Sequence, residues 1–85
     1  MANLANNPVD TRTFVEICAG LSKSERIELQ GEIASKVKRT GQCIYYWIKG
    51  MKTPSSALEQ ARISEVLNRK FNLSTHKKFL FPEKS

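Results

Sequence analysis

Four side chains in the stretch TGQCIYYWIKG, residues 40–50, could bind a large polar partner. They are Gln42, Tyr45, Tyr46 and Lys49. A glutamine amide can pair with the edge of an adenine, and a lysine ammonium binds guanine or phosphate. A tyrosine hydroxyl can donate to or accept from either kind of group. Because a buried helix rarely carries the glutamine and lysine, and a solvated helix rarely exposes two tyrosines, the stretch predicts a binding surface.

The positions of these residues on a helix separate them from the core. At about 100° per residue, the stretch divides into two faces. The predicted core side consists of Thr40, Ile44, Trp47 and Ile48, and the four polar side chains lie opposite. The free amides and positive end of the helix, near Thr40, Gly41 and Gln42, add to the attraction for an anion. One face therefore suits the core, and the other suits a nucleic acid groove.

Caps and apolar spacing predict the helices that hold this stretch. Asp10 is expected to cap a helix over 11–21, whose inner face is Phe14, Ile17, Cys18 and Leu21. Ser22 and Glu25 form an S-x-x-E capping box that opens a second helical stretch. Its regular part is expected over 30–38, and Gly31 is a weak point that could divide it. Its apolar positions are Ile27, Ile33, Ala34 and Val37.

The remaining elements follow from the same signals. Thr40 caps a helix over 41–49 that Gly50 ends. Ser56 and Glu59 repeat the capping box before a helix that runs to about residue 70, with Ile63, Val66, Leu67 and Phe71 inside. Ser74 is expected to cap a short turn over 75–80, ahead of Pro82. No segment alternates with period two for long enough to predict a strand.

The predicted fold is therefore all-α, a single small domain of four or five helices. Its 85 residues suit one modest core. The expected organisation is a flexible N-terminus at 1–9, the domain at 10–81 and a frayed C-terminus at 82–85. The apolar residues Phe79, Leu80 and Phe81 either pack back on the domain or form a dimer contact.

The charge of the chain favours an anionic partner. Net charge is +6, and no acidic residue lies between Glu32 and Glu59. The same window holds five cations: Lys36, Lys38, Arg39, Lys49 and Lys52. Such a window can be a solvated basic face, but it also fits a footprint on phosphates, where released counterions drive binding.

Other function classes find little support in the sequence. No apolar run approaches the roughly 20 residues of a membrane span. Cys18 and Cys43, without a secretion signal, favour reduced thiols and a cytoplasmic location. His76 has no Cys/His cluster around it, so no metal site is expected. Neither paired carboxylates, a glycine-rich phosphate loop nor a nucleophile with a histidine is present, and we predict no enzyme, cofactor or small-molecule substrate.

The central residues resemble a known family. The run IASKVKRTGQCIYYWIKGMKTP, residues 33–54, followed by Ile63 and Leu67, is similar to the helix-turn-helix of the Cro and phage-repressor (XRE-like) family. The resemblance covers roughly residues 29–71. It depends on the joint spacing of Ala34, Ile44, Trp47, Gly50 and Pro54, and this chain is identified as a divergent member.

The resemblance implies a lambda-repressor-like fold that binds double-stranded DNA, with the helix 41–49 in the major groove. The residues that it places at the DNA are Gln30, Thr40, Gly41, Gln42, Cys43, Tyr45, Tyr46, Lys49 and Lys52. Gln30, Thr40, Lys49 and Lys52 would contact phosphate, and the others would face bases or backbone. A homodimer on inverted half-sites is a further implication.

The chain also departs from the family pattern. Leu29 stands where the family has a cap, so the helix is expected to start earlier, from Ser22. Lys38 and Arg39 form the turn without a glycine, which predicts a strained or left-handed residue there. An alternative function remains open, in which the two tyrosines bind a protein and the helix-turn-helix is a protein-interaction module, such as an antitoxin-like or regulatory partner.

Overall fold

The computed structural model describes residues 9–82, and within them the fold is all-helical. Five helices follow in order. They are α1 (Phe14–Ala19), α2 (Lys23–Val37), α3 (Gly41–Lys49), α4 (Ala57–Phe71) and α5 (Lys77–Leu80). The expected flexible segment 1–9 and frayed segment 82–85 fall almost wholly outside the described residues. The all-α prediction is confirmed.

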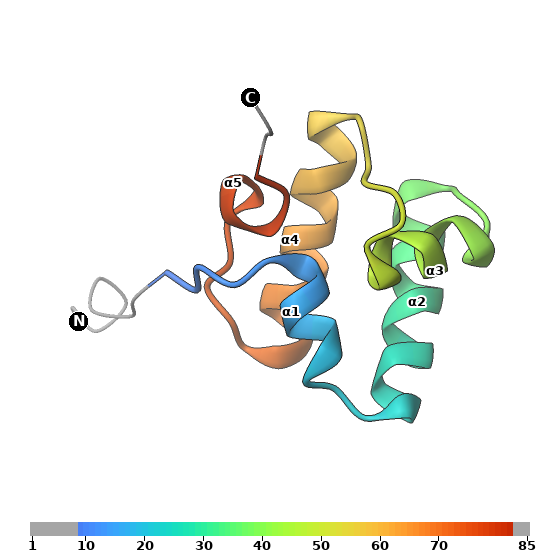
Figure 1. The fold of residues 1–85 in the computed structure, drawn as a ribbon, viewed down its shortest axis with the longest axis horizontal. Helices are drawn as coiled ribbons and strands as arrows, with labels where there is room; N and C mark the ends of the chain where they lie inside the picture. Colours follow the sequence, from blue (N-terminus) through green and yellow to red (C-terminus); the bar gives the residue numbers. More distant parts are fainter. Residues whose placement is uncertain (1–8, 83–85) are drawn as a thin grey trace.

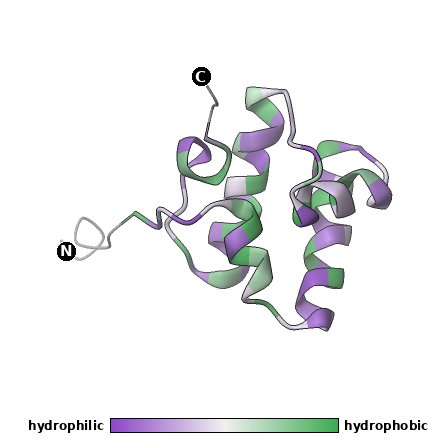
Figure 2. Cartoon of the chain, viewed as in Figure 1, coloured by the Kyte–Doolittle hydropathy of each residue, from purple (hydrophilic) through white to green (hydrophobic). Residues whose placement is uncertain are grey.

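The two longest helices, α2 and α4, pack against each other, and the shorter helices complete the core around them (Figure 1). α3 contacts α2 and α1, and α5 contacts α4 and α1. Hydrophilic and hydrophobic residues alternate by turn along α2 and α4 (Figure 2), which is the pattern of helices with one buried face. α3 therefore lies at one end of the domain and α5 at the other.

One apolar cluster joins all five helices. Phe14 of α1, Ile33 of α2, Ile44 of α3 and Leu67 of α4 are fully buried. Phe81, directly after α5, places its ring centroid 5.4 Å from that of Phe14. Leu80 and Phe81 are 2% and 8% exposed, which settles their position: they pack back on the domain. Their burial fixes the C-terminal end of the domain onto α1.

The first helix starts later than predicted. Thr13, rather than Asp10, is the N-cap, and its hydroxyl accepts from the Glu16 amide while the Glu16 carboxylate accepts from the Thr13 amide. This reciprocal box satisfies two backbone donors at once, which a cap at Asp10 would not. The Asp10 carboxylate instead accepts hydrogen bonds from the backbone amide, Nε and Nη2 of Arg12, which lower its pKa. The helix consequently covers 14–19 and not 11–21.

The second helix is longer and more regular than predicted. The Ser22–Glu25 capping box is present, and α2 runs without a break through Gly31. A glycine costs only about 1 kcal/mol inside a helix, which the burial of Leu29 and Ile33 on either side offsets. Ile27, predicted as an apolar core position, is 58% exposed, and Leu29 occupies the core in its place. The start at Ser22, expected from Leu29, is confirmed.

The C-terminal half also departs from the prediction in two caps. Ser56 accepts from the Leu58 and Glu59 amides, but Glu59 does not reach back, because its carboxylate binds Arg39. The short α5 is capped by His76, whose Nδ1 accepts from the Lys78 amide, and not by Ser74. The Ser74 carbonyl accepts instead from the Asp10 amide, at 2.8 Å. The first difference comes from a partner distant in the sequence, and the second from the start of α5 at Lys77, which makes His76 its cap.

Candidate nucleic-acid interface

The turn between α2 and α3 sets the direction of α3. Lys38 has φ 60° and ψ 47°, the left-handed conformation that the sequence predicted. The amides of Lys38 and Arg39 both donate to the carbonyl of Ala34, which closes the end of α2. Thr40 then caps α3 by accepting from the Cys43 amide at 3.2 Å. Three residues are thus enough to turn the chain and start a new helix.

The inner face of α3 agrees with the helical wheel, with one exception. Ile44, Trp47 and Ile48 are buried, at 0%, 4% and 6% exposure. Thr40, which was assigned to the core side, is exposed because its hydroxyl is used as the cap. The left-handed Gly50, at φ 79°, ends α3 as predicted, and its Cα lies against the Val15 side chain of α1. The inner face of α3 therefore packs against α2 and α1.

The outer face of α3 carries the four predicted side chains. Gln42, Tyr45 and Lys49 are exposed, and Tyr46 is half-buried. Tyr45 and Tyr46 meet edge to face, with ring centroids 6.1 Å apart. The structure brings all four onto one surface, but it divides that surface into two edges with different contacts.

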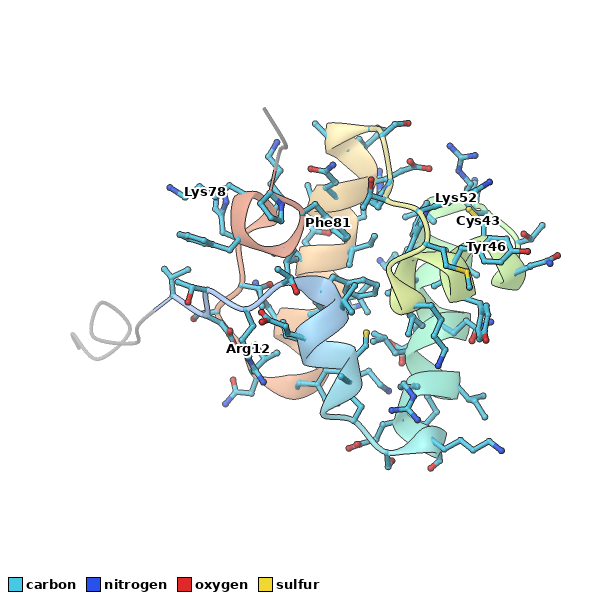
Figure 3. All side chains as sticks on the ribbon, in the orientation of Figure 1. Arg12, Cys43, Tyr46, Lys52, Lys78 and Phe81 are labelled. Atoms are coloured by element: carbon cyan, nitrogen blue, oxygen red, sulfur yellow. The ribbon has the colours of Figure 1, made fainter. Side chains whose placement is uncertain are left out.

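The first of these, the Gln42 edge, consists of Gln42, Tyr46 and Lys52. The Gln42 Nε2 donates to the Tyr46 hydroxyl at 2.9 Å. The Lys52 Nζ lies 5.6 Å from the Tyr46 ring centroid, and the Met51 amide donates to the Tyr46 carbonyl. Tyr46, Lys52 and Cys43 lie together over α3 in Figure 3. On this edge, a hydrogen bond holds the Gln42 amide and the Tyr46 hydroxyl in position, and the Lys52 ammonium lies beside them.

The second, the Tyr45 edge, consists of Tyr45 and Lys49 and faces the N-terminal half of α2. The Lys49 Nζ lies 5.7 Å from the Tyr45 ring centroid. Tyr45 is 42% exposed, and within residues 9–82 no hydrogen-bond partner lies near its hydroxyl. This edge presents a ring and a cation, without a preset hydrogen bond.

Gln30 and Gly41 contact each other where α2 meets α3. The Gln30 Nε2 donates to the Gly41 carbonyl at 2.8 Å. A Cβ at Gly41 would come within 3.3 Å of that nitrogen, so the glycine allows the close approach. One N–H of the Gln30 amide, predicted to contact phosphate, is therefore used to fix α3 to α2, which leaves its second N–H and its oxygen for other partners.

Three basic residues of the central window have different roles in the structure. Arg39 donates from Nε to Glu59 Oε2 at 2.6 Å, so it ties the turn to α4. That hydrogen bond to Glu59 raises the pKa of Arg39. The other oxygen of Glu59, Oε1, is buried without a partner among the described residues. Arg39 is thus a structural cation, while Lys49 and Lys52 stay available on the two edges of α3.

The two cysteines occupy different environments. Cys18 is buried in the core, and this burial raises the pKa of its thiol to about 12. Cys43 lies half-buried on α3, and both thiols are free. Cys18 is therefore a packing residue, and only Cys43 lies near the predicted contact surface.

Lys23 and Arg26 join this surface, although the sequence analysis did not single them out. They line a hollow beside Tyr45 and Lys49, together with Ile27, Gln30 and Ile48. Their signal in the sequence is the spacing of residues 23, 26, 27 and 30, which places all four on one side of a helix. The family pattern begins after them, so it could not point to them.

None of the helices described in residues 9–82 has the length and apolar character needed to cross a bilayer. No His, Cys, Asp or Glu cluster suited to a metal ion occurs in that part of the chain.

Comparisons with known proteins do not assign this chain to a family. No family model matches the sequence, and neither a curated protein nor a solved structure is found to be similar to it. The interpretation of the site therefore depends on its geometry.

Proposed function

We propose that this protein binds double-stranded DNA in a sequence-specific manner by inserting α3 into the major groove. Within the class of DNA-binding proteins, a transcriptional regulator or phage-type repressor fits best. The observation that carries the proposal is the outer face of α3, where Gln42, Tyr45, Tyr46 and Lys49 share one surface while Ile44 and Trp47 hold the helix from beneath.

The dimensions of α3 suit a groove. Nine residues span about 13 Å, and a helix with its side chains is about 10–12 Å wide, close to the roughly 12 Å of the major groove. The Gln42 amide can bond to an adenine edge, and the Tyr46 hydroxyl beside it adds a second polar group. Lys49 and Lys52, one on each edge, are placed to contact phosphates that flank the groove.

The resemblance to the Cro and phage-repressor family supports the same function. The left-handed Lys38, the cap at Thr40 and the buried Trp47 are what that resemblance requires of the chain. Proteins of this kind often bind as two-fold dimers. If this protein does so, Leu80 and Phe81 do not form the contact, because both are buried in their own domain.

The direct test is selection of binding sites from a random duplex pool, followed by titration of the selected duplex against salt. We expect enrichment of a short motif and an affinity that falls steeply as salt rises. A shuffled duplex of the same composition is the control for sequence preference. Failure to enrich any sequence, with a protein that is folded and helical by circular dichroism, would overturn the proposal.

A second candidate function is a protein-interaction module. The observation in its favour is the proximity of two exposed apolar side chains, Ile27 at 58% and Tyr45 at 42% exposure, which line one hollow. In that case the Tyr45 edge would bind a protein partner, and duplex DNA would not compete for it. Salt-sensitive duplex binding that Tyr45→Ala weakens would argue against this candidate.

A further inference from the structure

A basic furrow runs along the Tyr45 edge, between α3 and the first half of α2. Its lining comprises Lys23, Arg26, Ile27, Gln30, Tyr45, Ile48 and Lys49, around a hollow of about 210 Å³. A second hollow continues it toward α1, where Val15, Cys18 and Ala19 join Arg26, Ile48 and Lys49. Arg26, Ile48 and Lys49 line both hollows, so the two hollows adjoin and are together called the furrow.

Two parallel stripes of side chains build this furrow. Residues 23, 26, 27 and 30 form one stripe on α2, and residues 45, 48 and 49 form the other on α3. The α2 stripe exists because α2 begins at Lys23, two turns before Gln30. From Lys23 to Gln30 the stripe spans about 10 Å along the helix axis. The length of α2 therefore extends the surface beyond the outer face of α3.

The charge of the furrow has a single sign. It is lined by three cations, Lys23, Arg26 and Lys49, and by no carboxylate. By contrast, the hollow between α2 and α4 includes Glu28 and Glu32, which Lys70 bridges at 3.2 and 3.0 Å. The furrow on the side toward α3 thus has no acidic side chain to oppose an anion, whereas the hollow on the other side of α2 mixes charges of both signs.

Within residues 9–82, none of the three furrow cations pairs with a carboxylate, and one of them is held in place by backbone carbonyls. The Arg26 Nη1 donates to the carbonyls of Leu21 and Cys18, at 2.7 and 3.3 Å, which fixes the guanidinium at the junction of the two hollows. Lys23 is exposed and, within residues 9–82, has no ion-pair or hydrogen-bond partner. Ile27, Ile48 and the Tyr45 ring supply apolar surface between the charges.

From this arrangement we propose that the furrow binds one sugar–phosphate strand of the duplex, outside the base pairs that α3 reads, with Lys23 as a phosphate contact. A strand offers one negative charge per roughly 3.4 Å of helix rise, so the α2 stripe is long enough to meet more than one phosphate. The deoxyriboses between them would pack on Ile27 and Tyr45. This inference rests on the proposed DNA binding, and it adds Lys23 and Arg26 to the contact surface.

The test compares Lys23→Ala with Lys78→Ala on the duplex obtained by selection. Lys23 is exposed, so its replacement leaves the fold intact, which circular dichroism checks. Lys78 is also exposed but lies on α5, at the opposite end of the molecule (Figure 3), and serves as the matched loss of charge. Single phosphates flanking the selected site are replaced in turn by uncharged methylphosphonates, and affinity is measured for each protein.

For wild-type protein and Lys78→Ala, replacing one or two particular flanking phosphates by methylphosphonates should weaken binding, and the positions should be the same for both. Lys23→Ala should bind the unmodified duplex more weakly than wild-type protein does. At one of those positions, the methylphosphonate should cause Lys23→Ala no further loss of affinity. Its slope of log affinity against log salt should fall by about 0.9, the value for one phosphate contact.

The outcomes separate this inference from the proposed function. If Lys23→Ala keeps the wild-type slope and the wild-type response to every methylphosphonate, the furrow does not hold a strand, and DNA binding by α3 stands. If selection yields no duplex at all, both proposals fail.

Discussion

The two edges of α3 differ in whether a hydrogen bond within the protein already holds their side chains in position. On the Gln42 edge, an amide already donates to the Tyr46 hydroxyl and a lysine lies over the same ring. On the Tyr45 edge, a ring and a cation border a basic furrow without a preset hydrogen bond. Hydrogen bonds of fixed geometry discriminate between bases, whereas mobile charges attract any phosphate. Under the proposed DNA binding, the Gln42 edge would supply most of the sequence specificity and the Tyr45 edge most of the affinity for phosphate.

The largest expected effect comes from the residue beneath both edges. Trp47 is 4% exposed, and Trp47→Ala should lower the free energy of unfolding by roughly 3–5 kcal/mol through lost burial and a cavity. Because both edges depend on the packing of α3, sequence preference and salt-dependent binding should disappear together. Urea denaturation followed by circular dichroism measures the first effect. An unchanged midpoint would contradict the core position of Trp47.

The Gln42 edge should control sequence preference. Gln42→Ala is expected to weaken binding to the selected duplex by roughly 1–3 kcal/mol and to relax preference at one base pair. Tyr46→Phe removes the hydroxyl that positions the amide, so it should cost about 0.5–1.5 kcal/mol at the same base pair. Tyr45→Phe is the matched control, and its preference should stay that of the wild type. A larger loss of sequence preference for Tyr45→Phe than for Tyr46→Phe would mean that the Tyr45 edge, and not the Gln42 edge, controls that preference.

The lysines of the two edges should change binding in a different way from Gln42. Lys49→Ala and Lys52→Ala should each lower the slope of log affinity against log salt by about 0.9, and should weaken selected and shuffled duplexes alike. Titration of both duplexes over a range of salt concentrations gives the slopes. A change confined to the selected duplex would show that the lysine reads a base instead of a phosphate.

The smallest expected effect lies in the turn that orients both edges. Lys38 has φ 60°, which a glycine adopts without strain, so Lys38→Gly should raise the free energy of unfolding by about 0.5–1 kcal/mol. Asn72 has φ 56° at the end of α4, and because asparagine tolerates this region, Asn72→Gly should gain less. Chemical denaturation of both variants tests the order. A loss of stability in Lys38→Gly would mean that the lysine side chain stabilises the turn.

Much of α3 could be predicted because its signals are local. Thr40 and Gly50 bound a helix of nine residues, and the spacing of Ile44, Trp47 and Ile48 fixes which side is buried. The Ser22 box was also read correctly from a few neighbouring residues, and the left-handed residue of the Lys38–Arg39 turn followed from the missing glycine of the family pattern. Such signals depend on hydrogen bonds within one turn of helix, which the sequence displays directly.

Other features could not be read from neighbours. Ile27 looks like a core residue by spacing, yet α2 packs through Leu29 and Ile33 and leaves Ile27 in the furrow. Glu59 looks like half of a capping box, yet Arg39, twenty residues earlier, takes its carboxylate. Both outcomes depend on which helices meet, and that depends on the packing of the whole domain and not on the spacing within one helix.

The sequence by itself therefore determined the all-helical class, the limits of α3 and the side chains on its outer face, since periodicity and caps act over short distances. Only the tertiary structure decided how that face divides. The placement of α2 beside α3 put Lys23 and Arg26 next to Lys49, and the ion pair to α4 removed Arg39 from the available charges. Those pairings join residues far apart in the chain, and they form only when the helices pack around a common core.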